Sequence, residues 1–322
     1  MSKGATNILS RKLITASLLA WAFALQSDGA AAAETIPGFS GIWGHLTLPA
    51  FEPSLSGPGP VKNTVRIKPA AGLTNNSVRA SSGLISDVSR LVGDYTNPIL
   101  KPEAAEIVKQ HGLISLTGVA YPTPSDQCWP TGVPYVFWNE GMQMLQEPDK
   151  VTLLYLNDHE VRHVRLNAQH PEQVTPSWYG DSVGHYENGT LVIDTIGFKK
   201  GPYSMVDIYG TPFSEALHVV ERYRLIDYEA AEALEARPEK DGYDLNSVDP
   251  GFARDPGDRG KALLLEFTVE DSGVFTTPWS ATITYRRPMT PLGGWPEFVC
   301  AENTRDYIGR ALHLPQAEKP DF

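Results

Sequence analysis

Residues 182–195 read SVGHYENGTLVIDT, and this stretch is the clearest indication of the fold class. Hydrophobic and polar side chains alternate on both sides of Asn188-Gly189, and Asn-Gly is the strongest short-range signal for a two-residue hairpin turn. A two-residue loop also sets the register of the two strands. The expected pairs are Glu187 with Thr190, His185 with Val192 and Val183 with Asp194. The stretch predicts an antiparallel β-hairpin.

Similar period-two segments surround the hairpin. They span Val151–Leu156, Val161–Leu166, Leu217–Ile226, Leu263–Val269 and Ser280–Arg286, with a weaker one at Pro134–Trp138. Short alternating segments separated by turn residues are typical of antiparallel sheets. We expect an all-β fold, a single antiparallel β-barrel-like or strongly curved sheet domain of about eight to ten strands. Two short helices and a Pro-rich N-terminal extension complete it.

The first 33 residues have the pattern of a secretory signal peptide. Lys3, Arg11 and Lys12 precede the apolar run Leu13–Leu25, and small residues follow at Ala31–Ala33. The run is shorter than the about 20 residues that cross a bilayer. We expect export to the periplasm or the medium and no membrane partner after cleavage; an uncleaved N-terminal anchor is the alternative.

Composition changes along the rest of the chain. Residues 34–125 are interrupted by prolines and predict an irregular wrap, with one helix of about nine residues that begins with Pro102 in its first turn and that Gly112 ends. Residues 126–322 hold the expected β domain. Within it, 227–261 reads as a polar surface insertion that begins with a helix over Glu229–Arg237.

The formal charge of the 322-residue chain is -11, and 41% of its residues are hydrophobic. This composition excludes a disordered chain, and the acidic balance argues against a nucleic-acid partner. Cys128 and Cys300 are the two cysteines. A disulfide between them is the default in an exported protein, and two separately buried thiols are the alternative.

Residues 159–163 read HEVRH and match the H-E-x-x-H zinc pattern. That chemistry needs a helix, so that His159 and His163 share one face with Glu160 beside them. The flanking segments have strand composition instead, and we expect a hairpin turn here rather than a metal site. A zinc-dependent hydrolase that uses these three residues remains an alternative.

The hairpin register suggests an acid–base pair. Asp194 becomes a diagonal neighbour of His185, close enough for a carboxylate to orient an imidazole. Gly184, Tyr186, Leu191 and Ile193 make the opposite, packed face. The alternative is that His185 and Asp194 simply face solvent.

Glu221 is unusual in its strand, because alternation places it on the apolar face with Val219 and Tyr223. A carboxylate there needs a partner or a raised pKa. A structural salt bridge is one interpretation, and a role in an acid–base site is the other.

Several segments together carry a resemblance to a known family. They read PSWYGDSVGHYENGTLVIDTIGF from residue 176, SEALHVVERYR from residue 214, CWPTGVP from residue 128 and TPW from residue 277. Residues 125–303 are similar to an uncharacterised family of exported bacterial β proteins. No catalytic role is carried over from it. The 227–261 insertion is longer than the resemblance implies, and residues 49–125 lie outside it.

These patterns predict a protein that binds a small, partly apolar molecule and transforms it by metal-free general acid–base chemistry, as a lyase, isomerase or hydrolase. His185, Asp194 and Glu221 are the expected catalytic residues, with Tyr179, Asp181 and His218 in reserve. We expect no cofactor. A non-catalytic small-molecule binding module is the main alternative, and the sequence leaves the oligomeric state open.

Overall fold

The computed structural model describes residues 36–45, 51–68, 84–87, 89–119, 121–138, 141–156, 160–235 and 257–288. The expected signal peptide, His159 and Cys300 lie outside these residues. The zinc motif can therefore be judged on Glu160 and His163 alone, and the Cys128–Cys300 disulfide stays a prediction.

The described residues form twelve strands, two α-helices and two short 3-10 helices. The strands are β1 (Gly41–Gly44), β2 (Glu52–Pro53), β3 (Arg66–Ile67), β4 (Ile85–Ser86), β5 (Gly141–Gln146), β6 (Lys150–Tyr155), β7 (Val161–Leu166), β8 (Asp181–Glu187), β9 (Thr190–Ile196), β10 (His218–Ile226), β11 (Ala262–Glu270) and β12 (Trp279–Tyr285). The helices are α1 (Pro102–Leu116), α2 (Tyr228–Glu235), η1 (Ser125–Gln127) and η2 (Tyr135–Trp138). Neither α-helix has the length and apolar character to cross a bilayer, within the ranges described.

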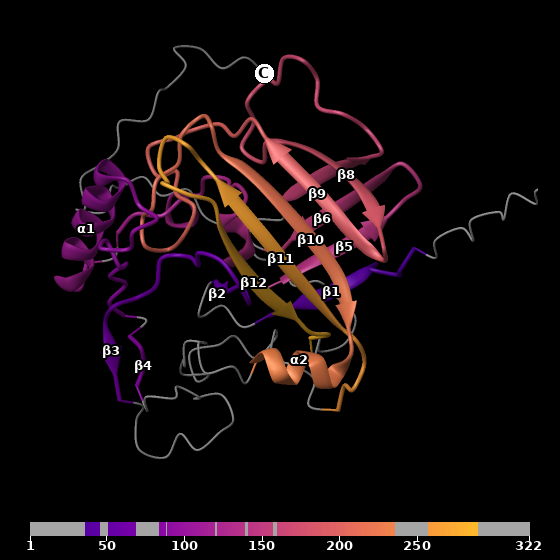
Figure 1. The fold of residues 1–322 in the computed structure, drawn as a ribbon, viewed down its shortest axis with the longest axis horizontal. Helices are drawn as coiled ribbons and strands as arrows, with labels where there is room; N and C mark the ends of the chain where they lie inside the picture. Colours follow the sequence, from indigo (N-terminus) through magenta and orange to yellow (C-terminus); the bar gives the residue numbers. More distant parts are fainter. Residues whose placement is uncertain are drawn as a thin grey trace, which may run out of the picture. The chain divides into compact units, whose positions relative to one another are not determined.

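Ten of the strands make one curled sheet that forms a half-barrel (Figure 1). Its order is β1-β5-β6-β7-β8-β9-β10-β11-β12-β2, and β3 and β4 pair separately. The all-β prediction is confirmed. An isolated antiparallel bridge joins Gly44, at the end of β1, to Arg286, directly after β12. This bridge draws two distant parts of the sheet together.

The central hairpin has the register expected from its turn. Glu187 pairs with Thr190, His185 with Val192 and Val183 with Asp194. Asn188 and Gly189 both have positive φ, as a tight hairpin turn of this kind requires. The hairpin prediction is confirmed residue by residue.

One pair of neighbouring strands departs from the antiparallel expectation. β7 and β8 are parallel, with Arg165 opposite Val183 and Leu166 opposite Gly184. Parallel neighbours need a crossover connection instead of a tight turn, and residues 167–180 provide it. The sheet is therefore mixed, and the crossover brings a loop alongside β8 and β9.

The Pro-rich segment contributes to the main sheet. β1 pairs with β5, and the short β2 pairs with β12. Pro53 lies in β2, the last strand in the order, where a residue that cannot donate a hydrogen bond is tolerated. Residues 34–125 thus supply the first and last strands of the ten.

Two local predictions were wrong, and one strand was missed. α1 continues through Gly112 to Leu116. Gly112 is required by packing and does not end the helix, because a Cβ there would lie 2.8 Å from a methyl of Val92. The segment Pro134–Trp138 forms η2 instead of a strand, with Tyr135, Val136 and Phe137 all buried. β5 was not expected.

The insertion begins as predicted with a helix, α2. Ala231 of α2 packs with Ile226, Ala262 and Leu264 in a small second cluster of buried side chains. Residues 236–256 lie outside the described ranges.

The two faces of the sheet differ in polarity. Pairing places Asp194 in one row with Val183 and Val220, and Glu221 in another row with Ile193 and Phe267. We call the face that carries Asp194 the solvent face and the face that carries Glu221 the core face. Side chains alternate between the two along each strand.

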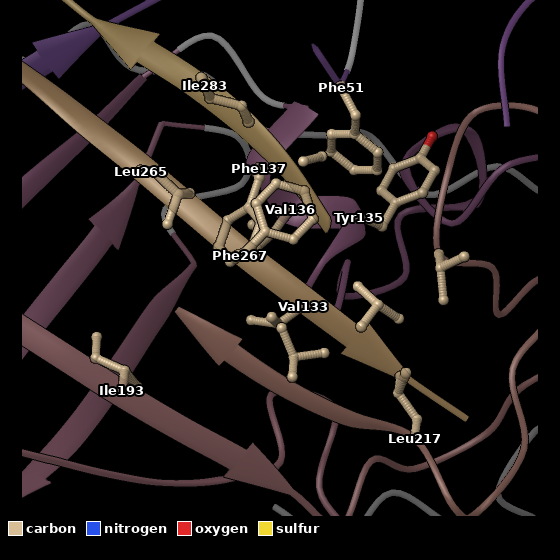
Figure 2. Close-up of a cluster of buried hydrophobic side chains, with 14 of the residues drawn as sticks. Phe51, Val133, Tyr135, Val136, Phe137, Ile193, Leu217, Leu265, Phe267 and Ile283 are labelled. Atoms are coloured by element: carbon tan, nitrogen blue, oxygen red, sulfur yellow. The ribbon is translucent and has the colours of Figure 1, made fainter. Parts of the chain in front are cut away.

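The core face packs against the segment around η2. Phe137 of η2 lies 5.1 Å from Phe267 of β11 between ring centroids, and Phe51 lies at the same distance from Phe267 (Figure 2). Val133, Leu265 and Ile193 belong to the same buried cluster. The described residues themselves therefore occupy much of the concave side of the half-barrel.

Candidate functional site

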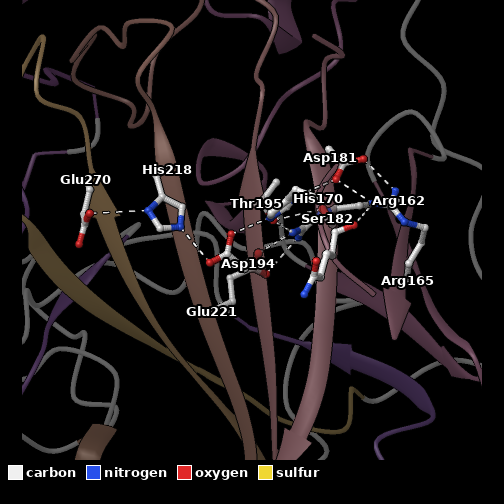
Figure 3. Close-up of polar contacts among 11 residues, drawn as sticks. Arg162, Arg165, His170, Asp181, Ser182, Asp194, Thr195, His218, Glu221 and Glu270 are labelled. Carbon is white, nitrogen blue, oxygen red and sulfur yellow. Dashed lines mark hydrogen bonds and ion pairs between the residues drawn. The ribbon is translucent and has the colours of Figure 1, made fainter. Parts of the chain in front are cut away.

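A chain of acidic and imidazole side chains crosses the solvent face from β7 to β11 (Figure 3). Its members, in spatial order, are Arg165, Asp181, His170, Asp194, His218 and Glu270. Five of them come from consecutive strands of the sheet, and His170 comes from the 167–180 crossover. Register brings the strand residues together, because His218 pairs with Glu270 and Asp194 pairs with Val220, two residues from His218.

Asp194 lies at the centre of this chain. Its Oδ2 is 3.0 Å from Nε2 of His218, and its Oδ1 is 2.9 Å from Nε2 of His170. An ionised carboxylate only accepts hydrogen bonds, so Nε2 of each imidazole is the donor. The contact fixes the protonation site of His218: in its neutral form, Nδ1 carries the lone pair.

His170 has a carboxylate on each side. Its Nδ1 lies 2.6 Å from Oδ1 of Asp181, and its Nε2 contacts Asp194. Both contacts are hydrogen bonds only when both ring nitrogens carry protons. Arg165 completes this end with a bidentate pair to Asp181, at 2.8 and 2.9 Å. The crossover loop is thereby fastened to the sheet beside Asp194.

At the His218–Glu270 end of this row of contacts lies a cavity of about 380 Å³. His218 and Glu270 line it, together with residues of the β11–β12 connection. Nδ1 of His218 is 3.6 Å from Oε2 of Glu270, longer than a hydrogen bond. A volume of this size is within the range of small-molecule sites, which is about 300–1,000 Å³.

The negative charge of the cavity comes from Glu270 and Asp271. Asp271 is buried and already engaged: its carboxylate accepts hydrogen bonds from Ser214 N (2.6 Å), Ser214 Oγ (2.5 Å) and Gly273 N (2.9 Å). These bonds hold the loop that follows Glu270. Glu270 is half-exposed and is the carboxylate nearest to Nδ1 of His218.

The pKa shifts at the site follow its hydrogen bonds. The bond from His218, opposed by burial, lowers the pKa of the Asp194 carboxyl. The bond to Asp194, also opposed by burial, raises the pKa of the His218 imidazole, with a further contribution from the charge of Glu270. The bond from Arg165 lowers the pKa of Asp181. The contact thus favours the ionised form of Asp194 and the protonated form of His218.

A second charged cluster lies on the core face. Arg162 and Glu221 are fully buried and form a bidentate pair, with Nη2–Oε1 at 2.5 Å and Nη1–Oε2 at 3.0 Å. Tyr223 donates to Oε2 of Glu221 at 3.0 Å. Thr195 and Ser182 accept from the guanidinium at 2.6 and 3.0 Å. The polar atoms of the pair are therefore widely satisfied.

Burial alone would lower the pKa of Arg162, but the charge of Glu221 and its hydrogen bonds outweigh it, and the pKa is raised. Burial raises the pKa of Tyr155, beside this pair, to about 12. The geometry thus fits the salt-bridge interpretation of Glu221.

The three residues expected to act together do not meet. Glu221 and Asp194 point to opposite faces of the sheet, because they lie in adjacent rows. His185 is exposed and lies 3.5 Å from Glu187. The expected pair of His185 with Asp194 is therefore corrected: the imidazoles that contact Asp194 are those of His170 and His218. Of the reserve residues, His218 and Asp181 belong to the chain of contacts. Tyr179 is half-buried in the crossover and is not among the described residues that line the cavity.

The zinc motif lacks the helix that it requires. His163 lies on strand β7, exposed, with Nδ1 3.2 Å from Thr152 Oγ1. Glu160 is buried and accepts hydrogen bonds from Thr131 N (2.7 Å) and Thr131 Oγ1 (2.8 Å). The described residues contain no group of three or more ligand-type side chains placed to hold a metal.

Sequence reasoning missed His170, Glu270 and Arg162. His170 reaches Asp194 through a parallel crossover, which local patterns do not reveal. Glu270 is the last residue of β11, a strand on the far side of the 227–261 insertion. For Arg162 a signal was present: in β7 it alternates with exposed residues and shares its face with Val164 and Leu166. A salt bridge between Arg162 and Glu221 could have been predicted, because each is a charged residue on the apolar face of its strand.

Comparison of the chain with protein-family models, curated proteins and solved structures finds no match. The geometry of the site therefore carries the functional argument, and the resemblance noted from the sequence stays a prediction.

Proposed function

We propose that the protein is an exported acid–base enzyme for a small, partly apolar molecule, with His218 as the group that moves the proton. The observation that carries the proposal is the place of His218: Asp194 holds its Nε2, and its ring lines a cavity of about 380 Å³. An oriented imidazole at the wall of a cavity is the usual arrangement for a general base.

Each member of the site has a distinct part in this proposal. His218 takes a proton at Nδ1 and returns it, and Asp194 orients the ring and stabilises the imidazolium. Glu270 lies 3.6 Å from Nδ1 and adds negative charge that favours the protonated form. His170 and Asp181 act behind Asp194 as positioning residues. No metal or cofactor enters this scheme.

Enolisable ketones offer a direct test, because a general base exchanges their α-protons with solvent. Purified protein in D₂O is incubated with a panel of cyclic and aromatic ketones, and deuterium uptake is followed by NMR. We expect catalysed exchange that His218→Gln lowers by about 10²-fold or more. His185→Gln is the matched control, because this exposed histidine lies outside the cavity lining.

Two results contradict the proposal. One is exchange that survives in His218→Gln, and the other is exchange that falls equally in both variants. Saturable ligand binding without turnover, unchanged by His218→Gln, favours the second candidate, a non-catalytic binding module in the same cavity. That candidate draws on the cavity itself, which would hold a ligand whether or not a proton moves.

A further inference from the structure

A second hollow, of about 750 Å³, lies next to the His218 cavity. Prolines and one isoleucine make most of its apolar wall: Pro53, Pro58, Pro60, Pro98 and Ile99. Proline rings have a fixed φ, so such a wall is rigid before anything binds. A preformed apolar surface loses little conformational entropy on binding a ligand.

The two hollows share part of their walls. Thr276 and Thr277 line both of them. Thr276 is held in place, since its N–H donates to Ile99 O and its Oγ1 to Pro98 O, both at 2.8 Å. The shared wall is thus fastened to the proline-lined side, and one molecule lying across Thr276–Thr277 reaches both hollows.

The proline-walled hollow favours an uncharged group. Lys62 and Asp94 both line it, so its formal charges balance. Oδ1 of Asp94 accepts bonds from Thr96 N (3.0 Å) and Thr96 Oγ1 (2.6 Å), and Oδ1 of Asn97 accepts one from Ile99 N (3.1 Å). These local bonds leave the prolines as the main contact surface.

The His218 cavity favours the opposite kind of group. Glu270 and Asp271 line it, and Asp194 lies behind the imidazole. An anionic group would be repelled by these carboxylates, whereas a cation or an uncharged hydrogen-bond donor would be attracted.

We infer that the substrate is an elongated amphiphile: an uncharged apolar part, aromatic or aliphatic, occupies the proline-walled hollow, and a cationic or uncharged polar part lies beside His218 and Glu270. This inference rests on the proposed function for the reacting end, and it adds the class of molecule and the place of the non-reacting end.

Phenylalkylamines of increasing chain length test it without knowledge of the substrate. Calorimetric titration of the protein starts with benzylamine, the shortest member of the series, and extends the linker one methylene at a time. We expect affinity to rise by up to about fourfold per methylene, pass through a maximum and then fall. Pro58→Asn should remove the gain for the long amines and spare benzylamine.

Ser56→Asn is the matched control, because Ser56 is exposed nearby and is not among the described residues that line either hollow. Glu270→Gln should weaken all chain lengths, since it acts on the ammonium end. Affinity that does not depend on chain length, or equal losses in Pro58→Asn and Ser56→Asn, would overturn the inference. His218→Gln should keep the chain-length optimum. If the acid–base proposal fails, the dependence of affinity on chain length therefore still tests this inference separately.

Discussion

The Arg162–Glu221 pair joins β7 to β10 and the His218–Asp194 pair joins β10 to β9, within one sheet, but the two pairs lie on opposite faces. Both partners of the first pair are at most 1% exposed, whereas His218 and Asp194 are 32% and 39% exposed. In the core-face pair, Glu221 also accepts a hydrogen bond from Tyr223, and Arg162 also donates to Thr195 and Ser182. The solvent-face pair leaves Nδ1 of His218 beside a cavity.

This difference separates two uses of a charged pair. A buried pair with all its bonds made is costly to break and has no route to a substrate. A half-exposed pair contributes less to stability, but it is accessible to a molecule in the cavity, which proton transfer requires. The buried carboxylate of Glu221 therefore fits a structural role. The carboxylate of Asp194, which binds an imidazole at a cavity wall, is the better candidate for a catalytic role.

The largest expected effect is on the core face. Glu221→Gln leaves Arg162 charged and unpaired in the interior, and we expect a loss of about 3–5 kcal/mol in the free energy of unfolding. Denaturant unfolding followed by tryptophan fluorescence measures it. Glu187→Gln removes the exposed partner of Arg222 and should leave stability unchanged. Equal stability of the two variants would refute the structural role of Glu221.

A smaller effect is expected from the crossover. His170→Gln removes two bonds to carboxylates that fasten the 167–180 loop, and we expect a loss of about 1–2 kcal/mol together with faster amide exchange in this loop. His163→Gln is the control, because its ring contacts only a hydroxyl among the contacts described. Hydrogen exchange that is unchanged in His170→Gln would show that other contacts hold the loop.

The smallest effect is a pH dependence of the solvent face. The lowered pKa of Asp194 stabilises the fold above its unfolded-state pKa of about 3.9, and this contribution is lost as pH falls through the folded pKa. The raised pKa of His218 stabilises the fold below about 6.5, and this contribution is lost as pH rises through the folded pKa.

The two contributions overlap between about pH 4 and 6.5. Unfolding curves at several pH values should show the largest stability difference between wild type and Asp194→Asn in this window, with smaller differences on both sides. A difference that grows steadily with pH would mean that the pair does not titrate as described.

The sequence predicted what depends on local alternation and failed where distant segments meet. The hairpin register followed from Asn188-Gly189 alone, and the strands flanking it followed from their period-two patterns. β1 is only four residues long and lies in a Pro-rich segment, so its place beside β5 was not visible. η2 has strand-like composition, but its aromatic side chains are used to fill the core.

The candidate site shows the same limit. Asp194 was identified from the hairpin register, and His218 and Asp181 were named as reserve residues in or beside predicted strands. Their partners were not, since the parallel β7–β8 crossover brings in His170, and the β10–β11 register across a long insertion brings in Glu270. Glu221 was recognised as anomalous, and the location of Arg162 beside it favours the salt-bridge interpretation.

The protonation of His218 shows whether Asp194 prepares this imidazole for proton transfer. Long-range ¹H–¹⁵N NMR correlations, recorded against pH, report which ring nitrogen carries the proton and the pKa of the ring. We predict the Nε2–H tautomer above the pKa, a pKa above the ordinary value, and a downward shift of that pKa in Asp194→Asn. A proton on Nδ1, or a pKa that Asp194→Asn leaves unchanged, would contradict the assignment of this pair as a prepared acid–base group.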